Sequence, residues 1–160
     1  MTLTREELEV LSGIFRAEAE ERLQSLADIF LAFDAEPARI PDLLVKAFRE
    51  AHSLKGSAGT LGFARVAVLS HRLEDVLGVL SRKSVAIEPE AIDLLLGTVK
   101  LIGLVVEQSM AGDDQTSEEE TATMERLAAL HEALSRLGDD EGEAGTKPTE
   151  ERPASEPEPE

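Results

Sequence analysis

The sequence predicts an all-α protein, an antiparallel four-helix bundle with an additional fifth C-terminal helix. Apolar residues recur at spacings of three and four across residues 1–137, without a convincing alternation of period two. Aromatic residues make up only 3% of the chain, and Tyr and Trp are absent, which favours an aliphatic core and helices over sheet. The segments between the periodic stretches are short, as expected when consecutive helices lie antiparallel.

The first two helices are predicted from the N-terminal cap at Thr4 to about Asp34, and from the proline at Pro41 onward. Thr4 can accept the capping hydrogen bond, and Pro41 suits a first helical turn. The apolar stripe of the first helix comprises Leu8, Leu11, Phe15, Leu23, Leu26, Phe30 and Phe33. The stripe of the second comprises Leu43, Leu44, Ala47, Phe48, Ala51 and Leu54.

The second helix raises a question, because Gly56, Gly59 and Gly62 follow one another within seven positions. Each glycine in a helix interior costs about 1 kcal/mol relative to alanine. The inward stripe nevertheless persists at Leu54 and Ala58. We therefore expect the helix to continue through Gly56 to position 59 or 60, with Gly62 in the turn that leads to the next helix.

Three further helices are predicted downstream. The third follows this turn, and its stripe comprises Val66, Leu69, Leu73, Val76, Leu77 and Leu80. The fourth begins at Pro89, runs to about Met110 and is apolar nearly all round, so it is expected to lie deepest in the bundle. Ser117 and Glu120 can form a capping box for the fifth, over residues 118–137.

Charge divides the chain into a helical domain, residues 1–137, and an acidic Pro-rich segment, residues 138–160. The segment has nine Asp and Glu against two Lys and Arg, and it contains four of the seven prolines. This composition predicts a disordered tail or an interdomain linker. The whole chain has a formal net charge of −17, which argues against nucleic acid or an anionic membrane as a partner.

Other features of the composition narrow the function further. The absence of cysteine excludes disulfides, thiolate zinc sites and cysteine nucleophiles. The N-terminus lacks the basic and then apolar plan of a secretion signal, and the apolar stretches contain charged residues and fall short of a membrane span. We therefore expect a cytoplasmic protein without membrane insertion.

His52 stands out because it lies off the inward stripe of the second helix. At about 100° per residue, its side chain is roughly 120° from the centre of that stripe and should face outward. Gly56 and Gly59 fall within about 40° of His52 and leave bare backbone beside it. Lys55, three residues after His52, adds a nearby ammonium group. The helix is therefore predicted to offer an exposed imidazole, a cation and room for a partner.

This arrangement suits nucleophilic attack on a phosphoryl group. A neutral imidazole, with an ordinary pKa of about 6.5, is a competent nucleophile near neutral pH. The product would be a phosphoimidazole, whose oxygens gain from the charge of Lys55. The ring also needs an acceptor that fixes one tautomer, and Glu74, at the margin of the third helix's stripe, is a candidate. His71 lies one turn before Glu74.

The same residues carry a resemblance to a known family. The segment AHSLKGSAGTLGF, followed by SHRLEDVL, resembles the histidine-containing phosphotransfer (HPt) domain, specifically the type found at the N-terminus of the chemotaxis kinase CheA. The similarity extends over residues 5–137. It implies that His52 accepts a phosphoryl group from ATP at a separate kinase domain. It also implies that His52 passes the group to an aspartate of a response-regulator receiver, CheY-like or CheB-like.

The resemblance implies a role for each neighbour of this histidine. Lys55 would stabilise phosphate charge, Glu74 would accept a hydrogen bond from one ring nitrogen, and His71 would be an auxiliary member of the same network. The phosphate and the partner would approach past three small residues, Gly56, Ser57 and Gly59.

No cofactor or metal is expected in the domain itself, because ATP and Mg²⁺ would belong to the kinase domain and Mg²⁺ also to the receiver. The isolated domain is expected to be a monomer and part of a histidine kinase, with a free-standing HPt phosphorelay protein as the alternative. A metal-binding bundle that uses His52, His71 and Glu74 is the other alternative, since two imidazoles and one carboxylate can hold zinc or iron. Lys55 argues against it, because its charge would repel a cation.

Overall fold

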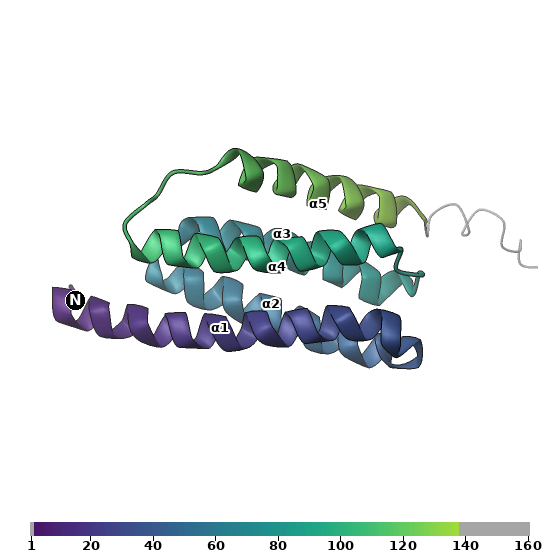
Figure 1. Cartoon of the computed structure of the whole chain (residues 1–160), viewed down its shortest axis with the longest axis horizontal. Helices are drawn as coiled ribbons and strands as arrows, with labels where there is room; N and C mark the ends of the chain where they lie inside the picture. The colour runs from purple at the N-terminus through teal and green to yellow at the C-terminus, as the bar shows by residue number, and fades with distance from the viewer. Residues whose placement is uncertain (1, 138–160) are drawn as a thin grey trace, which may run out of the picture.

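The computed structural model describes residues 2–137, which form five α-helices and one short 3₁₀ helix (Figure 1). The elements are α1 (Arg5–Ala35), η1 (Pro37–Arg39), α2 (Ile40–Leu61), α3 (Ala64–Lys83), α4 (Pro89–Met110) and α5 (Glu118–Leu137). No strand occurs among the described residues, so the all-α class is confirmed, and every predicted helix is present. The acidic tail predicted for residues 138–160 lies outside the described residues.

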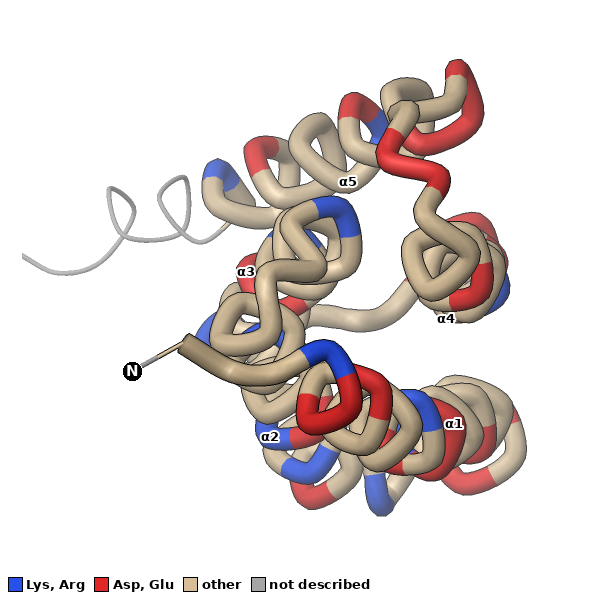
Figure 2. Tube along the Cα trace, turned by 90° about the vertical axis from the view of Figure 1, so that its left-hand side faces the viewer, with Lys and Arg blue, Asp and Glu red and all other residues tan. Residues whose placement is uncertain are grey.

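Helices α1 to α4 form the antiparallel four-helix bundle, and α5 lies outside it. Each of the five helices contacts its neighbours in the chain, and α1 also contacts α4, which closes the ring of four. Figure 2, which looks at the bundle from one end, shows the four helices around a common centre and α5 over α3 and α4. The predicted architecture is therefore confirmed.

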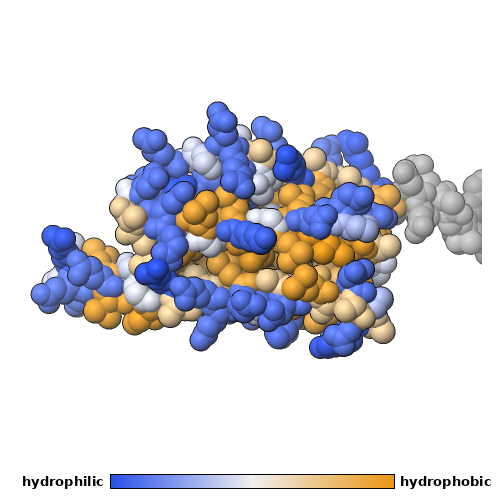
Figure 3. Space-filling model, in the orientation of Figure 1, coloured by the Kyte–Doolittle hydropathy of each residue, from blue (hydrophilic) through white to orange (hydrophobic). Residues whose placement is uncertain are grey.

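The helix with the most buried residues is α3, not α4 as the sequence predicts. Ten of the 20 residues of α3 are buried, against eight of the 22 in α4. The reason is that α3 packs extensively against both α2 and α5, whereas α4 packs extensively against α1 and only lightly against α5. One flank of α4 lacks such cover: Leu104 is 49% exposed, and Figure 3 shows apolar side chains at the surface over this helix. Even so, none of the helices within residues 2–137 is both long and apolar enough to cross a bilayer.

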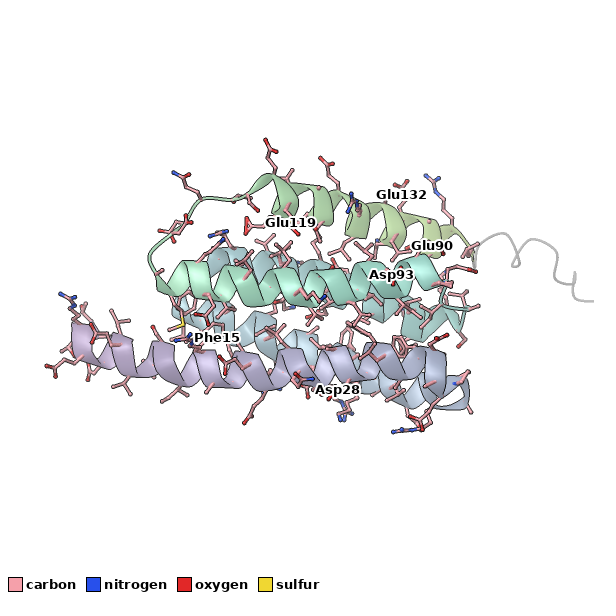
Figure 4. The ribbon with its side chains drawn as sticks, in the orientation of Figure 1. Phe15, Asp28, Glu90, Asp93, Glu119 and Glu132 are labelled. Carbon is pink, nitrogen blue, oxygen red and sulfur yellow. The ribbon has the colours of Figure 1, made fainter. Side chains whose placement is uncertain are left out.

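α1 begins at a capping box and extends past the bundle. The Thr4 hydroxyl accepts a hydrogen bond from the Glu7 N–H at 3.2 Å, and the Glu7 carboxylate accepts one from the Thr4 N–H at 2.7 Å. With 31 residues, α1 is about 46 Å long against about 30 Å for α3, so its first turns project beyond the other helices (Figure 1). Leu8, predicted to face inward, is therefore 46% exposed, whereas Phe15 further along is buried (labelled in Figure 4).

α2 continues through Gly56, as predicted, and ends just before Gly62. Gly62 has a φ of 83°, a left-handed conformation that glycine adopts without strain. The Phe63 N–H then donates to the Ala58 carbonyl at 2.9 Å, which satisfies a carbonyl at the end of the helix. The Phe63 ring stacks on Phe15 of α1 with centroids 4.9 Å apart, so the turn is held by both backbone and side-chain contacts.

An ion pair that helical periodicity does not predict attaches α5 to α3. The predicted capping box is present, with the Ser117 N–H donating to Glu120 Oε2 at 2.8 Å and the Glu120 N–H donating to Ser117 Oγ at 3.2 Å. Arg65 Nε of α3 also donates to the Glu120 carboxylate at 2.9 Å. The same guanidinium donates to the Asp113 carbonyl at 2.7 Å and to Gln108 Oε1 at 2.8 Å. One arginine therefore joins α3, the end of α4 and the start of α5.

Candidate functional site

His52 lies on the outer side of α2, as predicted. Its side chain is 62% exposed, whereas Ala51, the preceding residue, is fully buried. The ring of Phe48, one turn earlier, lies against the imidazole with centroids 6.2 Å apart and planes inclined by 13°. The apolar periodicity of the sequence assigns Phe48 only to the core stripe. The spacing of four residues between Phe48 and His52 is the sequence signal that predicts the contact of their rings.

Glu74 of α3 orients the imidazole. Its Oε2 lies 3.0 Å from His52 Nδ1, and its side chain is only 12% exposed. An ionised carboxylate can only accept a hydrogen bond, so the neutral ring carries its proton on Nδ1 and keeps a lone pair on Nε2. The sequence predicts Glu74 as the acceptor, and the structure adds that Nε2 is the nitrogen left free.

Lys55 binds the same carboxylate. Its Nζ lies 3.1 Å from Oε1 and 2.9 Å from Oε2 of Glu74, and its side chain is 29% exposed. Burial raises the pKa of the Glu74 carboxyl, but the hydrogen bonds and charges of Lys55 and His52 outweigh burial and hold that pKa below its ordinary value of 4.5. The site therefore contains an ionised carboxylate shared between a cation and the imidazole.

Gly56 and Gly59 face open space beside His52. Both are exposed, and a Cβ at either position would meet no atom within 4 Å. Neither glycine is therefore needed for close packing against another helix. Their effect is to keep the surface beside the imidazole low, as predicted, although glycine weakens the helix.

Ser57 lies at the α1 side of α2 instead of facing the solvent. It is half-buried, and its hydroxyl donates to Glu18 Oε1 of α1 at 3.2 Å. Arg22 binds the same Glu18 oxygen at 2.9 Å. These side chains line one part of a shallow groove of about 520 Å³ between α1 and α2, and His52 and Gly56 line another part. Ser57 thus connects the two helices within a groove that reaches the imidazole.

His71 does not join the network around Glu74. Its Nε2 lies 3.5 Å from Asp75 Oδ1, one turn further along α3, and its side chain is 57% exposed. Within residues 2–137, no hydrogen bond or ion pair connects it to His52 or Lys55. The same residues contain no group of three ligating side chains that could hold a metal ion, so this geometry does not support the metal-binding alternative. The auxiliary role of His71 stays a prediction.

Comparison with known proteins decides the family. The sequence model described as "Hpt domain" matches residues 10–140, which include all of α2 and α3. The chain belongs to the Hpt domain family. The resemblance seen in the sequence is thereby confirmed.

CheA proteins are among the relatives of this Hpt domain. It is 31% identical to the chemotaxis protein CheA of Listeria monocytogenes over 121 residues, which are 76% of this chain and 19% of that protein. It is 30% identical to CheA of Treponema pallidum over 119 residues, 74% of this chain and 14% of the relative. The chain thus spans less than a fifth of the length of these two relatives.

Two solved structures are similar to this Hpt domain. The CheA phosphotransferase domain from Thermotoga maritima has 35% identity and a TM-score of 0.58, with 64% of this chain and 96% of that chain covered. The phosphorylated P1 domain of CheA3, in complex with CheY6 from R. sphaeroides, has 21% identity and a TM-score of 0.66, with 79% and 96% covered. The latter likeness concerns the fold alone.

The lowered pKa of Glu74 makes part of the stability of the Hpt domain dependent on pH. A carboxyl whose pKa falls on folding stabilises the folded state above its unfolded pKa, and this contribution is lost as the pH falls through the folded pKa. We therefore expect the difference in unfolding free energy between the natural protein and Glu74→Gln to shrink as the pH falls below 4.5. Urea denaturation of both proteins at a series of pH values from about 7 to about 3 measures this difference. A difference that stays constant over this range would contradict the shift.

Replacing Gly56 or Gly59 by Ala is expected to stabilise the Hpt domain by about 1 kcal/mol each, because Ala favours the helix and its methyl group meets open space. Urea unfolding followed by circular dichroism measures this gain. Gly78→Ala is the matched control, since its Cβ would lie 3.2 Å from Arg82 Nη1 and 3.4 Å from Phe48 Cε2, and it should gain less. A loss of stability in Gly56→Ala would show that the glycine has a packing role after all.

Proposed function

We propose that this Hpt domain is a phosphoryl carrier in two-component chemotaxis signalling. His52 accepts the phosphoryl group from ATP bound to a CheA-type kinase domain and passes it to an aspartate of a response-regulator receiver. The observation that carries the proposal is the exposed imidazole whose Nδ1 is bound to the buried Glu74 carboxylate, so that Nε2 is free to attack. The similarity to CheA proteins supports the same conclusion.

Each step of the transfer follows from this geometry. In the first step, the lone pair of Nε2 attacks the γ-phosphorus of ATP, and the bond from that phosphorus to the bridging oxygen breaks to release ADP. The proton on Nδ1 stays between the ring and Glu74, whose charge stabilises the positive charge developing on the imidazole. In the second step, a carboxylate oxygen of the receiver attacks the same phosphorus, the N–P bond breaks, and its electron pair returns to Nε2. The Hpt domain ends the cycle unchanged.

Lys55 supplies charge for the phosphorylated state. A phosphoryl group brings about two negative charges near pH 7. The Lys55 side chain is partly exposed, and Glu74 is its one partner within residues 2–137, so its ammonium can turn from the carboxylate toward phosphate oxygens on the adjacent ring. In this proposal ATP and its Mg²⁺ are held by the kinase domain, and the Mg²⁺ of the second step is held by the receiver.

The proposed partners are a CheA-type kinase domain and a receiver of the CheY or CheB type, which meet the domain in the cytoplasm. The choice of partners rests on the similarity to CheA proteins, and a phosphorylated CheA3 P1 domain, whose fold this domain shares, is itself in complex with CheY6. The low surface at Gly56 and Gly59 suits docking by either partner. Both encounters need to be transient, so each should bury a modest area.

The proposal is tested by incubating the full chain with a CheA-type kinase domain, Mg²⁺ and γ-labelled ATP. We expect one phosphoryl group per chain, stable in base and labile in acid as a phosphoimidazole is, and its loss when a receiver is added. The control is the same mixture without the kinase domain. The proposal fails if the label is stable in acid, or if no label appears with a kinase domain that phosphorylates another Hpt domain.

Glu74→Gln is expected to slow the phosphorylation of His52 by about 100-fold, the lower end of what a positioned proton partner contributes. The Gln amide can donate to Nδ1 and so favour the tautomer whose proton is on Nε2, which removes the attacking lone pair. Initial rates of labelling measure the effect. Glu50→Gln is the matched control, because Glu50 is on α2 and binds Arg22 of α1 instead of the imidazole. Equal rates for the two variants would remove the tautomer-setting role of Glu74.

A further inference from the structure

Charge is distributed unevenly over this acidic protein. Residues 40–83, which form α2 and α3, contain seven Lys and Arg against four Asp and Glu, a net charge of +3. The net charge is −5 for residues 1–39, −8 for residues 84–137 and −7 for residues 138–160. In Figure 2, red prevails on α1, on α4 and at the start of α5, whereas blue is prominent on α2 and α3. Figure 4 labels four of the acidic residues of α4 and α5: Glu90, Asp93, Glu119 and Glu132.

A shallow groove between α2 and α3 contains a concentrated part of this cationic surface. It has a volume of about 210 Å³ and is lined by Val45, Phe48, Arg49, Gly78, Ser81 and Arg82. Among the described residues, two guanidinium groups line the groove and no carboxylate does. The ring of Phe48 also stacks on His52, so the groove begins directly beside the imidazole.

The two arginines of the groove do not hold the fold together. Within residues 2–137, neither Arg49 nor Arg82 makes a hydrogen bond or an ion pair. By contrast, Arg16, Arg22 and Arg65 each bind a carboxylate from another helix. Two guanidiniums in one groove, both without a carboxylate partner in the described part of the chain, form a site suited to carboxylate groups of a ligand.

The described chain ends at Leu137, close to this groove. The last turn of α5 is bound to the end of α3, where Lys83 Nζ donates to the Ser135 carbonyl at 3.1 Å. Lys83 directly follows Arg82, so α5 ends near the end of α3 that bears the groove. A flexible chain as long as the acidic segment 138–160 has a root-mean-square span of about 26 Å, whereas the helix from Lys83 back to Glu74 is only about 14 Å long. The whole groove therefore lies within reach.

The composition of the segment also fits this groove better than the other surfaces of the bundle. Residues 138–160 contain no Leu, Ile, Val, Met or aromatic residue, so they have little to bury in the apolar groove between α3 and α5. They contain nine carboxylates, which complement the only segment of the domain with a positive net charge. We propose that residues 138–160 dock on α2 and α3 through carboxylates bound by Arg49 and Arg82, beside His52. Each exposed pair is weak, but the tether keeps the local concentration of carboxylates high.

The test uses the absence of cysteine from the chain. Ser155→Cys in the full chain is then the single attachment point for a nitroxide spin label, and the broadening of backbone amide signals in NMR spectra shows which surface the label visits. We expect broadening centred on residues 45–49 and 78–82 at low salt, and several-fold weaker broadening on α4. At 1 M salt the broadening should largely disappear, because screening then acts over about 3 Å.

Matched variants test whether the two arginines of the groove cause the broadening. Arg49→Gln combined with Arg82→Gln should reduce the broadening several-fold. Lys100→Gln combined with Arg126→Gln, which removes the same charge from α4 and α5, should leave it unchanged. Broadening spread evenly over all helices, or broadening that the Arg49 and Arg82 changes leave intact, would overturn the proposal. A label that causes no broadening would also overturn it, and the groove would then be free for an anionic partner protein. No phosphoryl transfer is measured, so the result does not depend on the proposed function.

Discussion

Replacing His52 by Gln is expected to abolish phosphorylation of the domain. The Gln amide can still bind Glu74, but it offers no nitrogen lone pair that attacks phosphorus. Label transferred from ATP by a CheA-type kinase domain should fall to the level of the mixture without the kinase. Circular dichroism and urea unfolding should stay close to those of the natural protein, because 62% of the His52 side chain is exposed and few packing contacts are lost.

The chain has only three histidines, so the other two supply matched controls. His131→Gln, on α5, should be labelled at the natural rate. His71→Gln should also be labelled, because His71 is paired with Asp75 and is not bound to the Glu74 network. Its rate decides the predicted auxiliary role: a slower rate supports that role and an unchanged rate removes it. Label that persists in His52→Gln would place the nucleophile elsewhere.

Replacing Arg65 by Ala is expected to lower the unfolding free energy by about 3 kcal/mol. The change leaves the Glu120 carboxylate, whose side chain is 1% exposed, without its charged partner, and an uncompensated buried charge is strongly destabilising. The Asp113 carbonyl and the Gln108 side chain also lose their donor. Urea denaturation at neutral pH measures the loss.

Two further variants separate the buried ion pair from a general effect of removing an arginine. Arg5 pairs with Glu9 at the surface, where the side chains are 92% and 69% exposed, so Arg5→Ala should cost at most about 1 kcal/mol. Arg65→Met combined with Glu120→Leu replaces both charges by apolar side chains and should recover part of the lost stability, since the buried charge is gone but the hydrogen bonds to Asp113, Gln108 and Ser117 are lost. If Arg65→Ala costs no more than Arg5→Ala, Arg65 does not attach α5 as described.

The helix boundaries could be predicted because local chemistry sets them. Thr4 and Ser117 each stand three residues before a glutamate, and both form the capping boxes that this spacing predicts. Pro89 occupies the first position of α4, where its missing N–H has no consequence. These signals act within one helical turn, so they do not depend on how the helices pack.

Part of the candidate site could be predicted for the same reason. The placement of Lys55 and Gly56 relative to His52 follows from the geometry of one helix. Glu74 is on another helix, and its marginal position on the apolar stripe pointed to it as a neighbour. Only the packing of α3 against α2 determines that Glu74 binds His52 Nδ1 and shares its carboxylate with Lys55.

The amino-acid order alone was sufficient for the fold class, the number and approximate positions of the five helices and the residue types around His52. The packed bundle was needed to show that α3 is buried more than α4, that His71 pairs with Asp75 and that Arg65 pairs with Glu120. Helical periodicity identifies the apolar face of one helix, but it does not say which neighbour covers that face. Contacts between residues 55 positions apart depend on where whole helices lie, and those positions follow from the packing of the complete core.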